Sequence, residues 1–487
     1  MKSNSSGKSL TVVFLAVVLL TVLSTVDWHG VSGGHIKNFN LVEDLYMGDT
    51  TAIEINGQQD ADLIDPALMA AIDEVTSAAE LPVQRLTKTD DDSKTPLDVE
   101  TMPQDEVIRE ELPPPMPLIS PMKIDGVLPI EDYTPDGPGL KRFAEAIFRR
   151  GNRRARIAVI GDSYIEGDIF TQDIRSLLQS EYGGNGVGYM SMHSDFPGFR
   201  RSVNQSDKGW TVIDMRNKTR DEIRPLSGEY CIGEGAASVT YKGSKLDHAD
   251  KWSSTSLVFI APSNGLIKIT TDQGVEDIPV EKSDDIQSIN IEAETSKVTI
   301  SSQIAGLKVL GAWLEDNNGV GVDCMSLRGN SGVTHRTISV NTARSMNEFI
   351  PYDLIIVEYG LNALSAQQSD YSSYSKLMTG VINRIKECYP DADIMMLGVG
   401  DRGHKNGASV TSMRTVDAMV SAQRKCARDC GILFWDTREA MGGTGAIVDW
   451  RQRGLVNADY IHLNHKGGGE LAKEFVKALK LKIDETL

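Results

Sequence analysis

The sequence has few cysteines, few aromatic residues and almost no long apolar runs. Five cysteines in 487 residues are few and odd in number, so at least one thiol stays unpaired within a monomer and a disulfide framework does not hold the fold together. Apolar residues make up 40% of the chain and aromatic residues 6%, which is ordinary for a globular protein and excludes a bundle of membrane spans. No His/Cys cluster has zinc spacing, so we expect neither a metal nor another cofactor.

Basic charge is also scarce. The formal net charge is -18, and residues 41–137 contain 23 Asp and Glu against 5 Lys and Arg, so the rest of the chain is close to neutral. The chain has no basic stripe of the kind that releases counterions from a phosphate backbone. Nucleic acid is therefore not an expected partner.

The one long apolar run lies at the N-terminus. Lys2 and Lys8 precede it, and it extends over residues 10–23, which is the charged-then-hydrophobic order of an export signal. The run is short for a full membrane span, and no clear small-x-small cleavage site follows it. We expect residues 1–37 to form an export signal or an N-terminal membrane anchor, and the protein to be periplasmic or otherwise associated with the cell envelope.

Residues 38–128 differ in composition and periodicity from the residues that follow. They include the acidic run 90–92 and five prolines between positions 113 and 121, with little sustained periodicity. High charge with low hydrophobicity favours disorder, and proline favours extended geometry. This segment is predicted to be a largely disordered tether.

Residues 129–199 and 323–487 alternate between short apolar runs and helical spacing. A β-branched run at 156–160 ends directly before Gly161-Asp162-Ser163, which places Ser163 at a strand-to-helix junction. Other buried strands are expected at 354–359, 394–399 and 431–435, and helices at 139–150, 171–182, 373–388 and 412–429. This alternation predicts a doubly wound, three-layer α/β/α domain.

Residues 200–322 have a different periodicity. Polar and apolar residues alternate in short runs that are separated by turn signals such as Pro262-Ser263-Asn264-Gly265. Such runs lie at 238–241, 256–260, 266–271, 289–292 and 297–301. The pattern predicts an all-β sandwich inserted into the α/β domain.

Four short motifs carry chemistry. Ser163 follows the first strand, and Asn362 directly follows an apolar strand, at the sheet edge where ligand sites form. Asp459 lies three residues before His462, close enough for a carboxylate to orient an imidazole. The fourth motif is the glycine-rich loop Gly329-Asn330-Ser331-Gly332, whose backbone can approach a ligand closely.

In this order, the four motifs resemble the blocks of the SGNH (GDSL-like) hydrolase superfamily. Gly161-Asp162-Ser163-Tyr164 and the later run Gly183-Gly184-Asn185-Gly186-Val187-Gly188 are similar to peptidoglycan O-acetylesterases and related polysaccharide O-acetyl-modifying proteins. That branch has a flavodoxin-like α/β domain with an inserted domain resembling a carbohydrate-binding module. The resemblance covers about residues 139–487.

The resemblance implies a role for each matching residue. Ser163 would be the nucleophile, His462 its general base and Asp459 the group that orients His462. The oxyanion would be held by the N–H of Ser163, the N–H of Gly332 and the side-chain amide of Asn362, without a metal.

Three points of this assignment depart from the pattern or leave an alternative. Gly329 is an alternative to Gly332, and His465 is a weaker alternative to His462 because no acid lies three residues before it. The third block usually continues with Asp, whereas Ala363 stands there, so only the Asn role is carried over. Asp162 is expected to cap the nucleophile turn.

The predicted function is removal of acetyl groups from a cell-envelope or extracellular glycan through an acyl-enzyme, with the insert contributing to sugar binding. Two alternatives stay open. The same triad could transfer the acyl group to a sugar hydroxyl, or the chain could be a glycan-binding scaffold without activity.

Overall fold

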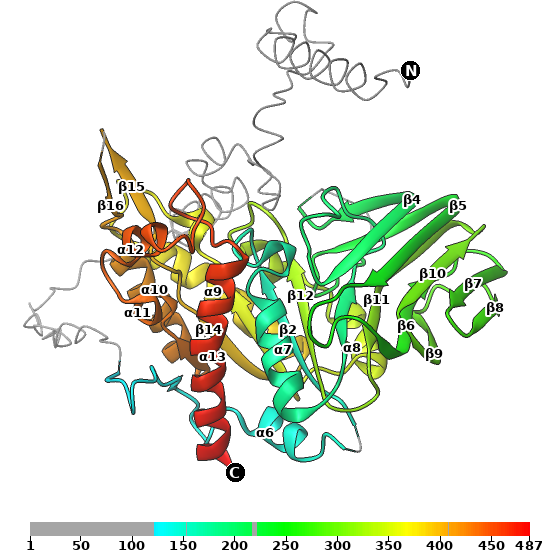
Figure 1. The fold of residues 1–487 in the computed structure, drawn as a ribbon, viewed down its shortest axis with the longest axis horizontal. Helices are drawn as coiled ribbons and strands as arrows, with labels where there is room; N and C mark the ends of the chain where they lie inside the picture. The colour runs from blue at the N-terminus through cyan, green and yellow to red at the C-terminus, as the bar shows by residue number, and fades with distance from the viewer. Residues whose placement is uncertain (1–120, 152, 217–221, 408) are drawn as a thin grey trace, which may run out of the picture. The chain divides into compact units, whose positions relative to one another are not determined.

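The computed structural model describes residues 121–151, 153–216, 222–407 and 409–487 (Figure 1). The expected export signal or anchor at 1–37 lies outside these residues, as does the expected tether up to residue 120. Within the described ranges, no helix is both long and apolar enough to cross a bilayer.

A six-stranded sheet forms the centre of the α/β domain. Its spatial order is β1-β17-β14-β13-β2-β12, and every neighbouring pair is parallel except β1 with β17. The strands are β1 (Glu131–Asp132), β2 (Ala155–Gly161), β12 (Val320–Ser326), β13 (Leu354–Glu358), β14 (Asp393–Leu397) and β17 (Leu433–Trp435). Among the five parallel strands of this sheet, β2 comes first along the chain and its two neighbours, β12 and β13, come next. This is the flavodoxin-like strand order, so the predicted doubly wound α/β fold is confirmed.

Helices form two groups on the sheet. Helix α13 contacts α6 and α7, and helix α9 contacts α8 and α10. Figure 1 shows α7 and α13 side by side. The helices are α6 (Lys141–Phe148), α7 (Thr171–Tyr182), α8 (Val340–Phe349), α9 (Ser372–Cys388), α10 (Val416–Cys430), α11 (Thr437–Met441), α12 (Ala446–Gln452) and α13 (His465–Thr486), with the short 3-10 turns η1 (Glu166–Asp168), η2 (Val333–Thr337) and η3 (Leu361–Ala363). Because the central strands β2 and β13 are buried on both faces, they are mostly apolar instead of alternating, with Arg156 and Glu358 as the charged exceptions.

The second sheet is antiparallel and forms the inserted domain. Its strands are β3 (Gly186–Met190), β4 (Val203–Asp214), β5 (Glu229–Gly243), β6 (Trp252–Ile260), β7 (Gly265–Thr271), β8 (Gly274–Val280), β9 (Gln287–Thr295), β10 (Lys297–Ser302) and β11 (Ala305–Glu315). The long strand β5 pairs with β11 near its start and with β10 near its end, so the sheet divides into two wings. Leu257 and Ile289 from one wing share a buried cluster with Ile267 and Val298 from the other. The wings therefore face each other, as expected for a sandwich.

The insert is anchored to the α/β sheet by a buried carboxylate. Asp323 in β12 is fully buried and accepts hydrogen bonds from Trp313 Nε1 in β11 (2.7 Å), from the Tyr352 hydroxyl (2.8 Å) and from the N–H of Tyr189 in β3 (2.9 Å). Buried polar groups that are fully hydrogen-bonded fix one arrangement of the parts they join.

The element boundaries differ from the expected ones at four places. Strand β3 lies before residue 200 yet pairs with β11, whereas β12 begins before residue 323 yet belongs to the parallel sheet. Leu128, at the end of the expected tether, is buried and its carbonyl accepts from Trp435 Nε1. Ser412, expected to begin a helix, ends the hairpin strand β16 (Ser409–Ser412), which pairs with β15 (Gly403–Asn406). The local sequence pattern does not indicate which sheet a short strand joins.

Candidate active site

Ser163 lies at the carboxyl end of β2, in the turn that leads into η1. Strand β2 runs between β12 and β13, so this is the point where the strand order reverses and ligands bind in such folds. The turn packs tightly against β13, because a Cβ on Gly161 would lie 2.7 Å from the carbonyl oxygen of Glu358. Only glycine fits there, which fixes where the nucleophile turn begins.

A second turn, between α12 and α13, carries the acid and the base. Tyr460 has a positive φ of 59°, and this tight turn lets Asp459 Oδ1 accept from the N–H groups of Ile461 (2.9 Å) and His462 (3.1 Å). Asp459 Oδ2 lies 2.8 Å from His462 Nδ1, and His462 Nε2 lies 2.9 Å from Ser163 Oγ. The structure thus joins the three predicted triad residues in one hydrogen-bonded chain.

The electrostatics of this turn suit the arrangement. Burial opposes the ionisation of Asp459, but the hydrogen bond and charge of His462 outweigh it and lower the pKa of that carboxyl. An ionised Asp459 that accepts from Nδ1–H leaves Nε2 of His462 as the acceptor facing Ser163.

Asn362 lies beside the nucleophile turn. Its Nδ2 donates to Asp162 Oδ2 (2.8 Å) and to the carbonyl oxygen of Asn330 (3.1 Å). Asp162 also accepts from the N–H of Tyr164 (2.9 Å), as expected of a residue that caps the turn. Burial outweighs these hydrogen bonds and raises the pKa of Asp162 to about 6.

The two glycines of the Gly-rich loop differ in what their backbones do. Gly332 is buried against the Tyr359 ring, 2.7 Å from where its Cβ would stand, and its N–H donates to Asn330 Oδ1 at 2.6 Å. Gly329 is partly exposed, and its N–H donates to no group within the described ranges. Gly332 would have to break a hydrogen bond to reach an oxyanion, whereas Gly329 would not.

His465, the alternative base, lies at the first position of α13. Its ring packs edge-on against Phe199 at 6.4 Å, and burial lowers its pKa to about 4. It makes no hydrogen bond to Ser163 in the described structure, where His462 occupies that place.

Two acidic residues near the site were not singled out from the sequence. Glu358 ends β13, is 2% exposed, and lies under Gly161. Burial, reinforced by the charge of Asp162, raises the pKa of Glu358 well above its usual range. The signal was an acid at the end of an otherwise apolar strand. Glu166 follows the nucleophile turn and pairs with Arg328 at 2.7 Å, a contact between distant segments that no local pattern indicates.

No group of three or more His, Cys, Asp or Glu side chains in the described ranges has the arrangement of a metal site. The three triad residues, Asn362 and the backbone of the Gly-rich loop lie at this edge of the sheet. They supply a hydroxyl, an oriented imidazole and amide donors, which are the functional groups that acyl transfer uses.

Comparison with known proteins agrees with this architecture. No protein-family model and no curated protein matches the sequence. Among solved structures, a peptidoglycan O-acetylesterase is 22% identical, with 73% of this chain and 99% of that chain covered and a TM-score of 0.62. A family two carbohydrate esterase from Cellvibrio japonicus is 11% identical, with 58% and 98% covered and a TM-score of 0.26. The first likeness shows that the chain shares the fold of that peptidoglycan O-acetylesterase.

Proposed function

We propose that the protein is a serine-dependent O-acetylesterase that removes acetyl groups from a cell-envelope or extracellular glycan. The observation that carries the proposal is the hydrogen-bonded chain Ser163–His462–Asp459 at the switch point of the sheet. The shared fold with a peptidoglycan O-acetylesterase supports the choice of an acetylated glycan as substrate. The charged-then-apolar N-terminal segment supports an exported or membrane-anchored location.

In this mechanism His462 Nε2 takes the proton of Ser163 Oγ as that oxygen attacks the ester carbonyl. Asp459 keeps the imidazole in the required tautomer and stabilises its cation. The tetrahedral intermediate collapses when His462 returns the proton to the sugar oxygen, which leaves Ser163 acetylated. A water molecule then gives its proton to His462 and attacks the acetyl carbon, so acetate is released and Ser163 regains its proton.

The oxyanion would be held by the N–H of Ser163, a backbone N–H from the Gly-rich loop and the amide of Asn362. Asn362 Nδ2 already donates to Asp162 and Asn330, so it would release one of these two hydrogen bonds to reach the oxyanion. Gly329 is the better third candidate than Gly332, because the N–H of Gly332 already donates to Asn330. Each donor of this kind contributes about 10² to 10³ in rate.

The proposal is tested with the purified protein and a small chromogenic acetate ester, with and without an oligosaccharide acceptor. We expect acetate to be released, and an acetyl group to appear on Ser163 when turnover is stopped early. Ser163→Ala is the control that must abolish both. Acetylation of the acceptor would instead identify an acetyltransferase, and silence in every assay would favour a glycan-binding scaffold.

A further inference from the structure

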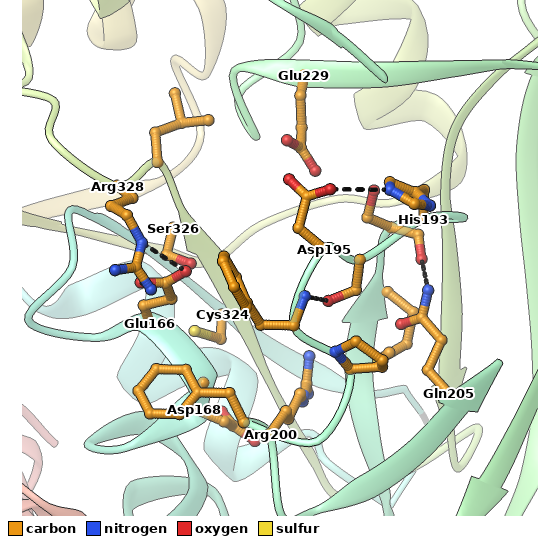
Figure 2. Close-up of a pocket in the computed structure, with 18 of the residues that line it drawn as sticks. Glu166, Asp168, His193, Asp195, Arg200, Gln205, Glu229, Cys324, Ser326 and Arg328 are labelled. Carbon is orange, nitrogen blue, oxygen red and sulfur yellow. Dashed lines mark hydrogen bonds and ion pairs between the residues drawn. The ribbon is translucent and has the colours of Figure 1, made fainter. Parts of the chain in front are cut away.

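A cavity of about 450 Å³ lies where the insert meets the α/β sheet (Figure 2), and its lining does not include the triad residues. The insert supplies the loop between β3 and β4 and the facing ends of β4 and β5. The α/β domain supplies η1 and the residues at the end of β12, among them Ser326 and Arg328. The volume is within the range of small-molecule binding pockets.

The cavity opens close to the nucleophile. Ser326, on its wall, is the register partner of Gly161, and neighbouring strands lie about 4.8 Å apart. Glu166, also on the wall, comes three residues after Ser163 and pairs with Arg328. A ligand in the cavity would therefore be a direct neighbour of a group bound at Ser163.

The wall combines an exposed aromatic ring with hydrogen-bonding groups. Phe196 is 43% exposed, and the Arg328 guanidinium lies 5.2 Å from its ring centroid. Next to it, His193 joins two carboxylates: Asp195 Oδ1 is 3.2 Å from Nε2, and Asp207 Oδ2 is 2.7 Å from Nδ1. An aromatic ring can cover the apolar face of a sugar, and the carboxylate of Asp195 on the same wall can accept from sugar hydroxyls. This combination matches a sugar better than an acyl chain, which has no hydroxyl to donate.

Glu229 adds a group that can both accept and donate. Its side chain lines the cavity from the start of β5, and Figure 2 shows it directed toward the loop that carries Asp195. Burial raises the pKa of Glu229 to about 7, against an opposing hydrogen bond from Ser191. A carboxyl whose pKa is raised keeps its proton to higher pH, so it can donate a hydrogen bond to a hydroxyl as well as accept one.

The loop that carries Phe196 is held in place before any ligand arrives. Arg200 donates to the carbonyl oxygens of Val187 (2.6 Å) and Tyr189 (3.0 Å), and the N–H of Phe199 donates to the carbonyl of Phe196 (3.0 Å). A preorganised wall loses less conformational freedom on binding than a flexible one.

We propose that this cavity binds one pyranose ring of the acylated glycan, next to the ring that carries the ester, with Phe196 as the stacking surface and Asp195 and Glu229 as hydroxyl partners. The proposal rests on the esterase function proposed above and gives the insert a specific part in it. The insert contributes to the catalytic cleft itself, so polymer recognition and ester cleavage share one site.

The test compares polymeric and small substrates. The polymers are O-acetylated peptidoglycan solubilised by a muramidase and acetylated xylan, and the one with the higher wild-type kcat/KM is used. We expect Phe196→Ala to raise KM for this polymer about tenfold, and by more than it changes KM for the small acetate ester. Phe196→Tyr should restore most of the loss, because the stacking face is kept, and Asp195→Asn should raise KM for the polymer severalfold.

Phe349→Ala is the matched control, because Phe349 is 41% exposed at the end of α8 and does not line the cavity. Equal polymer KM in the Phe196→Ala and Phe349→Ala variants would overturn the subsite, as would a Phe196→Tyr variant no better than Phe196→Ala. Failure of the underlying function is seen separately, since a wild-type protein that cleaves neither polymer nor the small ester is not this esterase.

Discussion

Asp162 and Asp168 lie on either side of the nucleophile turn, and both are fully buried, yet they differ in how their charge is compensated. Asp168 accepts from Arg175 Nη1 (2.7 Å) and Nη2 (2.8 Å), and Arg200 Nε is 3.3 Å away. Burial opposes its ionisation, but the two arginines prevail and hold its pKa well below the usual range.

Asp162 has no cation among its hydrogen-bond partners. It has only the N–H of Tyr164 and the amide of Asn362, and Glu358 beneath it is a second acid. Its pKa is raised accordingly. Two arginines thus balance the buried charge where the insert and the sheet are joined, whereas burial dominates at the edge where we place catalysis. Buried acids with raised pKa values, such as Asp162, are typical of functional sites.

Changes at the catalytic edge should remove activity without loss of stability. We expect Ser163→Ala and His462→Ala each to lower kcat for a small acetate ester by roughly 10⁴-fold or more, because the triad acts as a unit. Steady-state kinetics give the effect, and urea unfolding should show a free energy of unfolding close to that of the wild type. If His465→Ala proved more damaging than His462→Ala, the base would be misassigned.

Asp168→Asn should lower the stability of the fold with little loss of activity. Removing the carboxylate leaves the buried Arg175 without its ion pair, which costs about 3 to 5 kcal/mol in the free energy of unfolding. Urea unfolding at neutral pH measures this loss, while kcat per folded molecule should fall less than about tenfold. A stable but inactive Asp168→Asn protein would contradict the structural role assigned to Asp168.

Asn362→Ala tests the amide donor at the catalytic edge. We expect kcat to fall by about 10² to 10³ with little change in KM, because the donor acts on charge that develops only in the transition state. Its hydrogen bonds to Asp162 and Asn330 also position neighbouring groups, so stability is measured in parallel. A rise in KM with unchanged kcat would assign Asn362 to ground-state binding.

The smallest expected effect concerns how stability depends on pH. The folded pKa of Asp162 is above its unfolded value of 3.8, so its ionisation costs stability as pH rises from about 4 to about 6. The cost of Asp162→Asn should therefore shrink over that window. Asp168 has a lowered pKa and stabilises the fold above pH about 4, so the cost of Asp168→Asn should shrink only when pH falls below that value. Urea titrations from about pH 2 to pH 7 cover both windows, and parallel curves would contradict the opposite shifts.

Much of the fold follows from local pattern because periodicity reports burial directly. The apolar run at 354–359 became β13, the period-two runs at 266–271 and 297–301 became β7 and β10, and the helix at 171–182 is α7 with the same bounds. Short elements could not be predicted from the local pattern. Strand β12 and the hairpin β15–β16 lack a distinctive pattern, since a few polar and glycine residues pair as strands only when their neighbours are in place.

The order of the chemical groups could be predicted from the sequence alone: Ser163 follows one strand, Asn362 follows another, and Asp459 lies three residues before His462. Spacing within a turn is local, so it could be read in advance. The contacts between distant segments could be seen only in the folded structure. Examples are Glu358 under Gly161 and Arg328, which contacts both Glu166 and Phe196. The physical reason is that hydrogen bonding, burial and charge depend on distances between segments far apart in the chain, and strand order alone brings those segments together.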